Sequence, residues 1–156
     1  MIIDATDSVM GRIAAVAAKK ALLGESINIV NCENAIVTGR KVRVLADFKQ
    51  KLDRGIPLKG PYFPKQSDRI FRRAIRGMLP YKKERGKEAF KRIMCHIGVP
   101  DKFSSQKLEL IGDASVSKLP NVKYVYLKDI AKHLGGKLWK QFKLQEIEKE
   151  QLQEQH

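Results

Sequence analysis

Long apolar runs are missing from this chain of 156 residues. The longest run, Ile13 to Ala18, is far shorter than the roughly 20 apolar residues that a membrane-spanning helix needs. The opening residues, MIIDATDS, also lack the basic start and apolar stretch of a secretory signal. We therefore expect a cytoplasmic protein that does not cross a membrane.

Cysteine and histidine are scarce as well. The two cysteines, Cys32 and Cys95, show no spacing typical of a disulfide framework, so we expect reduced, mostly buried thiols. The histidines are scattered at His96, His133 and His156, without the ligand spacing of a metal site. Cys95 and His96 are adjacent in a predicted strand and would point to opposite faces, which argues against a catalytic pair. The sequence predicts no metal and no cofactor.

The common catalytic motifs are also absent. The segment DATDSVMG, between the first predicted strand and helix, has neither a dinucleotide fingerprint nor a Walker lysine. Ser104 and Ser105 lack the context of a nucleophile elbow. An α/β enzyme that holds a phosphate at its first helix remains an alternative class. We predict a protein without enzymatic activity and without a small-molecule substrate.

What the chain does have is basic charge, and most of it lies in one segment. The whole chain carries 31 basic and 17 acidic residues, a net charge of +14. Residues 40–92 alone hold 18 basic and 5 acidic residues, a net +13, whereas 1–39 carries −1 and 93–156 carries +2. A block of like charge repels itself unless it binds a counter-charge. The pattern therefore favours a polyanionic partner, such as RNA, DNA or an acidic membrane surface.

Apolar periodicity predicts one α/β domain over residues 1–156. A strand at 1–4, a helix at 9–24 and a strand at 27–31 form a βαβ unit, whose strands are parallel. The next segment, 34–39, is either a turn or a third short strand. Later elements are expected as helices at 40–55, at 67–79 and from 87, strands at 94–97 and 108–111, a strand and helix within 124–136, and a helical tail at 137–156.

The segment SDRIFRRAIRGMLP, residues 67–80, predicts a helix with two different faces. At about 100° per residue, three further arginines fall within roughly 60° of Arg69 on either side. We call Arg69, Arg72, Arg73 and Arg76 the arginine row. The other side is apolar and consists of Ile70, Phe71, Ala74, Ile75 and Met78. We therefore expect Glu at Arg72 and Arg76 to abolish polyanion binding without unfolding the domain, and Asp at Ala74 to unfold it.

The surroundings of the arginine row favour phosphate binding over a merely solvated face. A solvated face held by salt bridges would need acidic partners, and only Asp68 lies nearby in the sequence. Arginine is suited to bidentate contact with phosphate. The flanking segments, an extended proline loop at 56–66 and the sequence YKKERGK, supply Lys59, Tyr62, Phe63, Lys65, Lys82, Lys83, Arg85 and Lys87. A membrane-binding helix is disfavoured because the core needs the apolar face.

Four segments resemble the L-thirteen family of large-subunit ribosomal proteins, in its archaeal branch. They are MGRIAAVAAKKALLG, VNCENAIVTGRK, KGPYFPKQSDRIFRRAIRGMLPYKKERGKEAFKR and YLKDIAKHLGG. Within the third, RGMLPYKKERG is similar to the most specific signature of that family. The similarity covers residues 1–137, and His96 in MCHIG departs from the family pattern.

The resemblance implies a three-layer α/β/α fold with a four-stranded, mostly parallel sheet. The sequence pattern itself adds a basic loop and helix extension and a C-terminal helix. The resemblance also implies binding to 23S-type large-subunit rRNA, support of subunit assembly, contact with neighbouring ribosomal proteins and no catalysis. By position, it places RNA contacts at Arg40, Lys41, Lys59, Tyr62, the arginine row, Lys82, Lys83 and Arg85. The alternative is an RNA-binding or RNA-modifying α/β protein outside the ribosome.

Overall fold

The computed structural model describes residues 1–56, 58–120 and 123–136, which form a mixed α/β fold. Its strands are β1 (Ile2–Asp4), β2 (Ile27–Val30), β3 (Ile36–Thr38), β4 (Ile93–Cys95) and β5 (Tyr124–Tyr126). Its helices are α1 (Met10–Leu22), α2 (Lys41–Asp53), α3 (Ser67–Met78), α4 (Glu84–Lys91), α5 (Asp101–Ser104) and α6 (Leu127–His133), with short 3-10 helices at Cys32–Asn34, Gly112–Ala114 and Val116–Lys118. The tail helix predicted for 137–156 lies outside the described residues. None of the helices described is long and apolar enough to cross a membrane.

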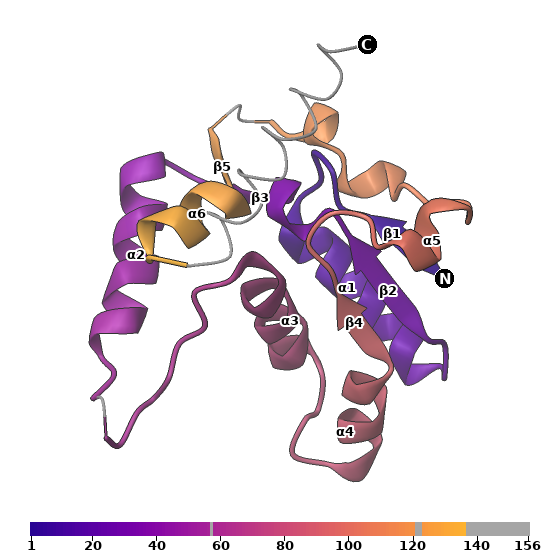
Figure 1. Cartoon of the computed structure of the whole chain (residues 1–156), viewed down its shortest axis with the longest axis horizontal. Helices are drawn as coiled ribbons and strands as arrows, with labels where there is room; N and C mark the ends of the chain where they lie inside the picture. The colour runs from indigo at the N-terminus through magenta and orange to yellow at the C-terminus, as the bar shows by residue number, and fades with distance from the viewer. Residues whose placement is uncertain (57, 121–122, 137–156) are drawn as a thin grey trace.

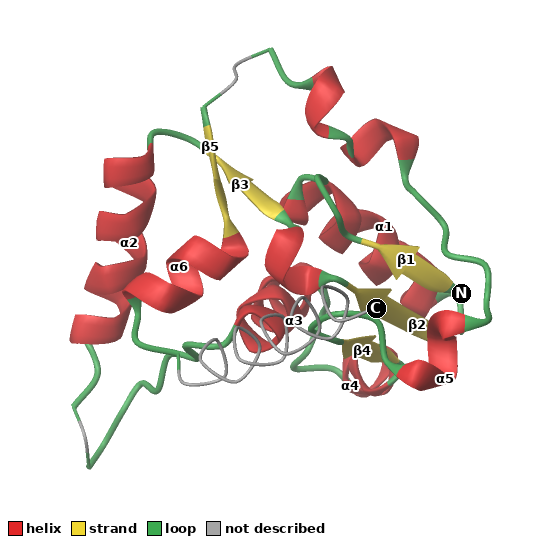
Figure 2. Cartoon of the chain, turned by 45° about the horizontal axis from the view of Figure 1, so that its top comes forward, coloured by secondary structure: helices red, strands yellow, loops and turns green. Residues whose placement is uncertain are grey.

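The strands form two separate sheets (Figure 2). One is parallel, in the order β1-β2-β4, and contains the βαβ unit predicted from the sequence. The other pairs β3 with β5 in antiparallel register, Val37 opposite Val125. The segment that could be a turn or a strand is therefore a strand, and its partner comes from the far end of the described chain.

The parallel sheet has three strands, where the family resemblance implied four. The predicted strand at 108–111 does lie beside β1, but it makes a single parallel bridge, between Ile3 and Glu109. In that bridge Asp4 N–H donates to the Glu109 carbonyl at 3.0 Å, and Glu109 N–H donates to the Ile2 carbonyl at 2.9 Å. Leu110 is 69% exposed, so continued pairing would bury little apolar surface at this edge.

One face of the parallel sheet supplies much of the core. Its side chains are at most 9% exposed: Ile3, Ile27, Ile29, Ile93 and Cys95. They join a single hydrophobic cluster with the small side chains Ala14 and Ala17 of α1 and with Phe71 of α3. On the opposite face, Met94 is 44% exposed, but Ile2 and Val30 are at most 6% exposed, so this face is partly covered. The helical layer that contains α1 and α3 is shown. A second helical layer, as in the predicted α/β/α arrangement, is not confirmed in the described part of the chain.

The basic half of the molecule surrounds α3. Figure 1 shows α2 and α6 on one side of this helix and α4 below it, with a long connection between α2 and α3 that projects from the body. That connection is the predicted proline loop, and its apolar residue Leu58 is 91% exposed. The fold therefore presents α3 between a projecting loop and the start of α4.

Candidate nucleic-acid interface

Helix α3 positions the arginine row because its apolar residues are anchored in the core. Ile70, Phe71 and Ile75 are at most 3% exposed, as the helical wheel predicted. The helix ends at Met78, and Leu79 is extended, since a residue that precedes proline disfavours the helical conformation. The sequence thus fixes both the end of α3 and the side of it that faces solvent.

The four arginines are not equally exposed. Arg69 and Arg76 are exposed, whereas Arg72 and Arg73 are half-buried. The prediction that Arg72 points freely outward is therefore wrong. Its guanidinium carbon lies 4.5 Å from the centre of the Phe90 ring of α4, a ring that the helical wheel of α3 could not include.

Three members of the row are held by aromatic rings. Arg72 lies on Phe90. The guanidinium carbon of Arg73 lies 4.8 Å from the centre of the Phe63 ring, and that of Arg76 lies 5.3 Å from the centre of the Tyr81 ring. Arg73 also donates from Nη1 to the Tyr62 carbonyl oxygen at 3.2 Å. A guanidinium that lies on a ring keeps its N–H donors along its edge, and these remain suited to phosphate oxygens. The rings therefore orient the row before any partner binds.

The row has no carboxylate partner in the residues that the structure describes. The salt bridges found there join Lys87 to Glu84, Arg92 to Glu88 and Lys118 to Asp113. The Nε of Arg72 is buried without a hydrogen-bond partner in the same part of the chain. The alternative of a solvated face held by internal salt bridges is thus not supported here, and the charge of the row is available to an anion.

Most of the predicted flanking residues lie at the surface on either side of α3. Lys82, Lys83 and Arg85 are exposed around the start of α4, and Lys59 and Lys65 are exposed on the proline loop. Tyr62 is 69% exposed. Lys87 forms an exposed ion pair with Glu84 at 3.3 Å, which contributes little stability and can exchange for a phosphate contact.

Arg40 and Lys41 lie elsewhere, at the start of α2. Arg40 lines a separate hollow of about 590 Å³ together with Arg12 and Lys123. Arg12 also donates to the Asp113 carbonyl oxygen at 2.7 Å. Sequence reasoning missed Arg12 and Lys123, because they lie outside the basic segment and join it only in the fold. The predicted contacts therefore fall into two basic surfaces rather than one.

The two cysteines, far apart in the sequence, are neighbours in the structure. Cys32 follows β2 and Cys95 ends β4, which pairs with β2. Both are free and buried, as predicted. Burial raises the pKa of the Cys32 thiol well above its usual value, and the contact with Cys95 acts in the same direction. Cys32 is therefore protonated and unreactive at neutral pH.

His96 lies outside the arginine row and adds no charge to it. Its ring centre is 5.5 Å from that of Phe103. Burial lowers the pKa of His96, and the nearby carboxylate of Asp68 opposes that shift. Within the described ranges, no three His, Cys, Asp or Glu side chains gather where they could hold a metal ion.

The apolar side of α3 also differs from the prediction at two positions. Met78 is 46% exposed, and Ala74 is half-buried at the edge of an open pocket. An aspartate at position 74 could therefore reach solvent, and Arg73 of the same pocket is nearby. The prediction that Ala74→Asp unfolds the domain is replaced by one about its neighbour, Ile75.

Ile75→Asp is expected to unfold the domain, because Ile75 is 0% exposed and an unpaired carboxylate there has no route to water. The cost is several kcal/mol, comparable with the roughly 5–15 kcal/mol that stabilises a typical domain. Ala74→Asp is expected to lower the melting temperature much less. Circular dichroism melts of the two variants check this, and equal losses would show that position 74 is as enclosed as position 75.

Comparison with known proteins identifies the family. A family model described as "Ribosomal protein L13" matches residues 1–102. The "Large ribosomal subunit protein uL13" of Methanopyrus kandleri is 44% identical over 136 residues, which is 86% of each chain. The proteins of the same name from Archaeoglobus fulgidus and Haloarcula marismortui are 43% and 40% identical, over 86% and 89% of this chain and 86% and 94% of their own lengths. The resemblance noted in the sequence is thus confirmed, and the chain belongs to the ribosomal protein L13 family.

Proposed function

We propose that this chain is a structural component of the large ribosomal subunit. In this role it binds 23S-type large-subunit rRNA, supports assembly of the subunit, contacts neighbouring ribosomal proteins and catalyses no reaction. Its location is then the cytoplasm, and residues 1–156 act as one domain. The names of its relatives support this role, since the chain matches 86% or more of the length of each of the three compared.

The observation that best supports RNA binding is that the arginine row is available to an anion and has no internal carboxylate partner in the described residues. Four guanidinium groups lie along one helix, three of them on aromatic rings, and none has a carboxylate partner in the described residues. Arginine edges at the spacing of helical turns can bind successive phosphates of an RNA backbone. The full set of proposed contacts is Arg40, Lys41, Lys59, Tyr62, Lys65, Arg69, Arg72, Arg73, Arg76, Lys82, Lys83, Arg85 and Lys87.

Binding to large-subunit rRNA is expected to weaken steeply as salt rises, because each phosphate contact releases a condensed counterion. If the row and its flanks neutralise on the order of six to ten phosphates, the affinity falls by roughly 10³ to 10⁵ between about 50 and 200 mM salt. Filter binding of the purified full chain to rRNA fragments measures this slope. A salt-insensitive affinity would show that phosphate contacts do not drive binding.

Co-sedimentation separates the ribosomal role from RNA binding in general. The chain is expected to remain with large subunits through a high-salt wash, because an assembled protein is held by surrounding RNA and protein as well as by charge. Loss of the chain in the wash, combined with turnover of a nucleotide or a methyl donor by the purified protein, would favour the alternative of an RNA-modifying protein.

A further inference from the structure

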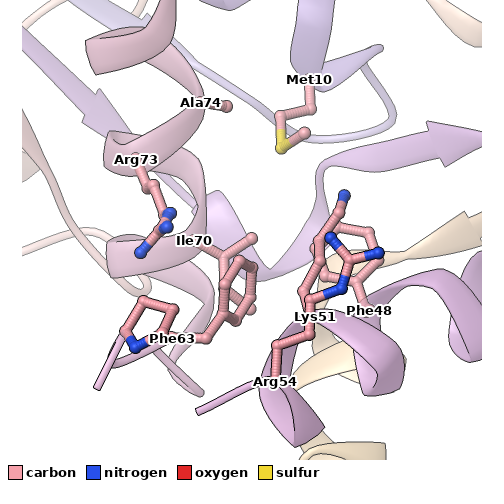
Figure 3. Close-up of a pocket in the computed structure, with 9 residues that line it drawn as sticks. Met10, Phe48, Lys51, Arg54, Phe63, Ile70, Arg73 and Ala74 are labelled. Carbon is pink, nitrogen blue, oxygen red and sulfur yellow. The ribbon is translucent and has the colours of Figure 1, made fainter. Parts of the chain in front are cut away.

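A preformed pocket lies where α2, α3 and the proline loop meet. Phosphate binding by the arginine row assigns no role to this pocket. Its volume is about 450 Å³, within the range of roughly 300–1,000 Å³ that is common for small-molecule sites. The inner wall is apolar: Ile70 is 3% exposed and Phe48 is 9% exposed, and Met10 of α1 closes one end (Figure 3).

The walls are fixed before anything binds. The rings of Phe48 and Phe63 contact each other edge to face, with centres 6.0 Å apart and planes at 75°. The guanidinium carbon of Arg73 lies 4.8 Å from the centre of the Phe63 ring, and Lys51 Nζ lies 4.9 Å from the centre of the Phe48 ring. A wall held in this way loses little conformational freedom on binding, which favours affinity.

The mouth of the pocket is cationic. Figure 3 shows Arg73 of α3 on one side and Lys51 and Arg54, from the end of α2, on the other. Among the described residues that line the pocket, none is acidic. Apolar walls below three cations suit a ligand with a flat, apolar group and an attached anion. A protein side chain without a negative charge fits them less well.

We propose that this pocket takes up one unpaired nucleotide of the bound RNA. Its base enters between Phe63, Ile70 and Met10, and its phosphate lies near Arg54 and Arg73. This deepens the proposed function and rests on it. Proteins commonly read RNA through bases that leave the stack and lie on aromatic rings or guanidinium planes.

RNA is favoured over a protein segment as the occupant because of Arg73. This residue belongs both to the arginine row and to the mouth of the pocket, so a backbone that follows the row passes directly over the opening. The next nucleotide along that backbone is then within reach of the aromatic walls. Binding at this pocket therefore requires that the RNA has an unpaired base at one position.

The test fills the pocket without removing a charge. Figure 3 shows Ala74 of α3 beside Met10, so the leucine of Ala74→Leu occupies the space that the base would use. The expected result is an affinity for deproteinised large-subunit rRNA roughly tenfold lower, about the effect of losing one stacked base. The dependence on salt should keep its slope, because no phosphate contact is lost. Ala46→Leu, at an exposed position of α2 that does not line the pocket, is the matched control.

The outcomes separate this inference from the proposed function. Wild-type affinity of Ala74→Leu, with a steep salt dependence, overturns the pocket and leaves rRNA binding intact. A wild-type chain without salt-sensitive binding overturns the proposed function itself. Because Ala74→Leu could also lower stability, ultraviolet crosslinking of the wild-type chain to rRNA gives a second reading. Crosslinked bases on peptides with Met10 or Phe63 support the proposal, and their absence, or a partner protein crosslinked there in whole subunits, overturns it.

Discussion

Replacement of Arg69 and Arg76 together by glutamate is expected to abolish binding to large-subunit rRNA, with little change in melting temperature. Both side chains are exposed at the two ends of the arginine row. The change would remove two of the proposed phosphate contacts and place two negative charges opposite the RNA backbone, so the affinity should fall by a factor on the order of 10² or more. The salt slope should decrease by about one for each lost contact.

Stability should be almost unaffected, since exposed substitutions of this kind usually change it by about 0.5 kcal/mol or less. Within the described residues, the contact that Arg76 gives up is the one with the Tyr81 ring. Arg72, which the sequence also favoured for this test, is a poorer choice because it packs on Phe90 with a buried Nε. Its replacement by glutamate would combine a loss of binding with a loss of packing.

The matched control reverses the same amount of charge away from the row. Lys102 and Lys107 are exposed, on α5 and just after it, and both can be changed to glutamate. This double variant should bind rRNA nearly as tightly as the wild-type chain. If both double variants lose affinity equally, net charge rather than the row carries the binding. Gel-shift titration at fixed salt, with melting curves of each variant, decides between these results.

Gly86→Ala is expected to destabilise the domain by about 2 kcal/mol or more, as overpacked sites commonly do. Gly86 is buried at the start of α4, where a Cβ would overlap the Pro80 carbonyl group and lie 2.9 Å from the Tyr81 nitrogen. These are backbone atoms, so the turn itself must move. For a chain of this size the melting temperature should fall by roughly 5–10 °C.

The same turn carries Lys82 and Lys83, so rRNA binding by Gly86→Ala is expected to weaken as well. Gly77→Ala is the control, because a Cβ at Gly77 meets nothing within 4 Å and the residue is exposed within α3. That change should stabilise the domain by about 0.5–1 kcal/mol, as alanine does in place of glycine within a helix. If Gly86→Ala melts at the wild-type temperature, the close approach of α4 to the Pro80 turn is not required.

Local sequence determined much of this protein. The parallel βαβ unit, the extent of α2 and α3 and the arginine row follow from apolar periodicity and from breakers such as Pro80, which act within a few residues. The predicted helices at 40–55 and 67–79 differ from the observed Lys41–Asp53 and Ser67–Met78 by at most two residues at either end. The concentration of charge in residues 40–92 and the family itself were also readable from the sequence.

Only the tertiary structure decided which of these features meet. The ring of Phe90 partly covers Arg72, β3 pairs with β5 from the far end of the described chain, and Glu109 adds a single bridge where a fourth strand was expected. The pocket likewise combines Lys51 and Arg54 of α2 with Arg73 of α3. Periodicity reports the direction of a side chain relative to its own helix or strand, whereas these contacts depend on how separate elements pack against one another.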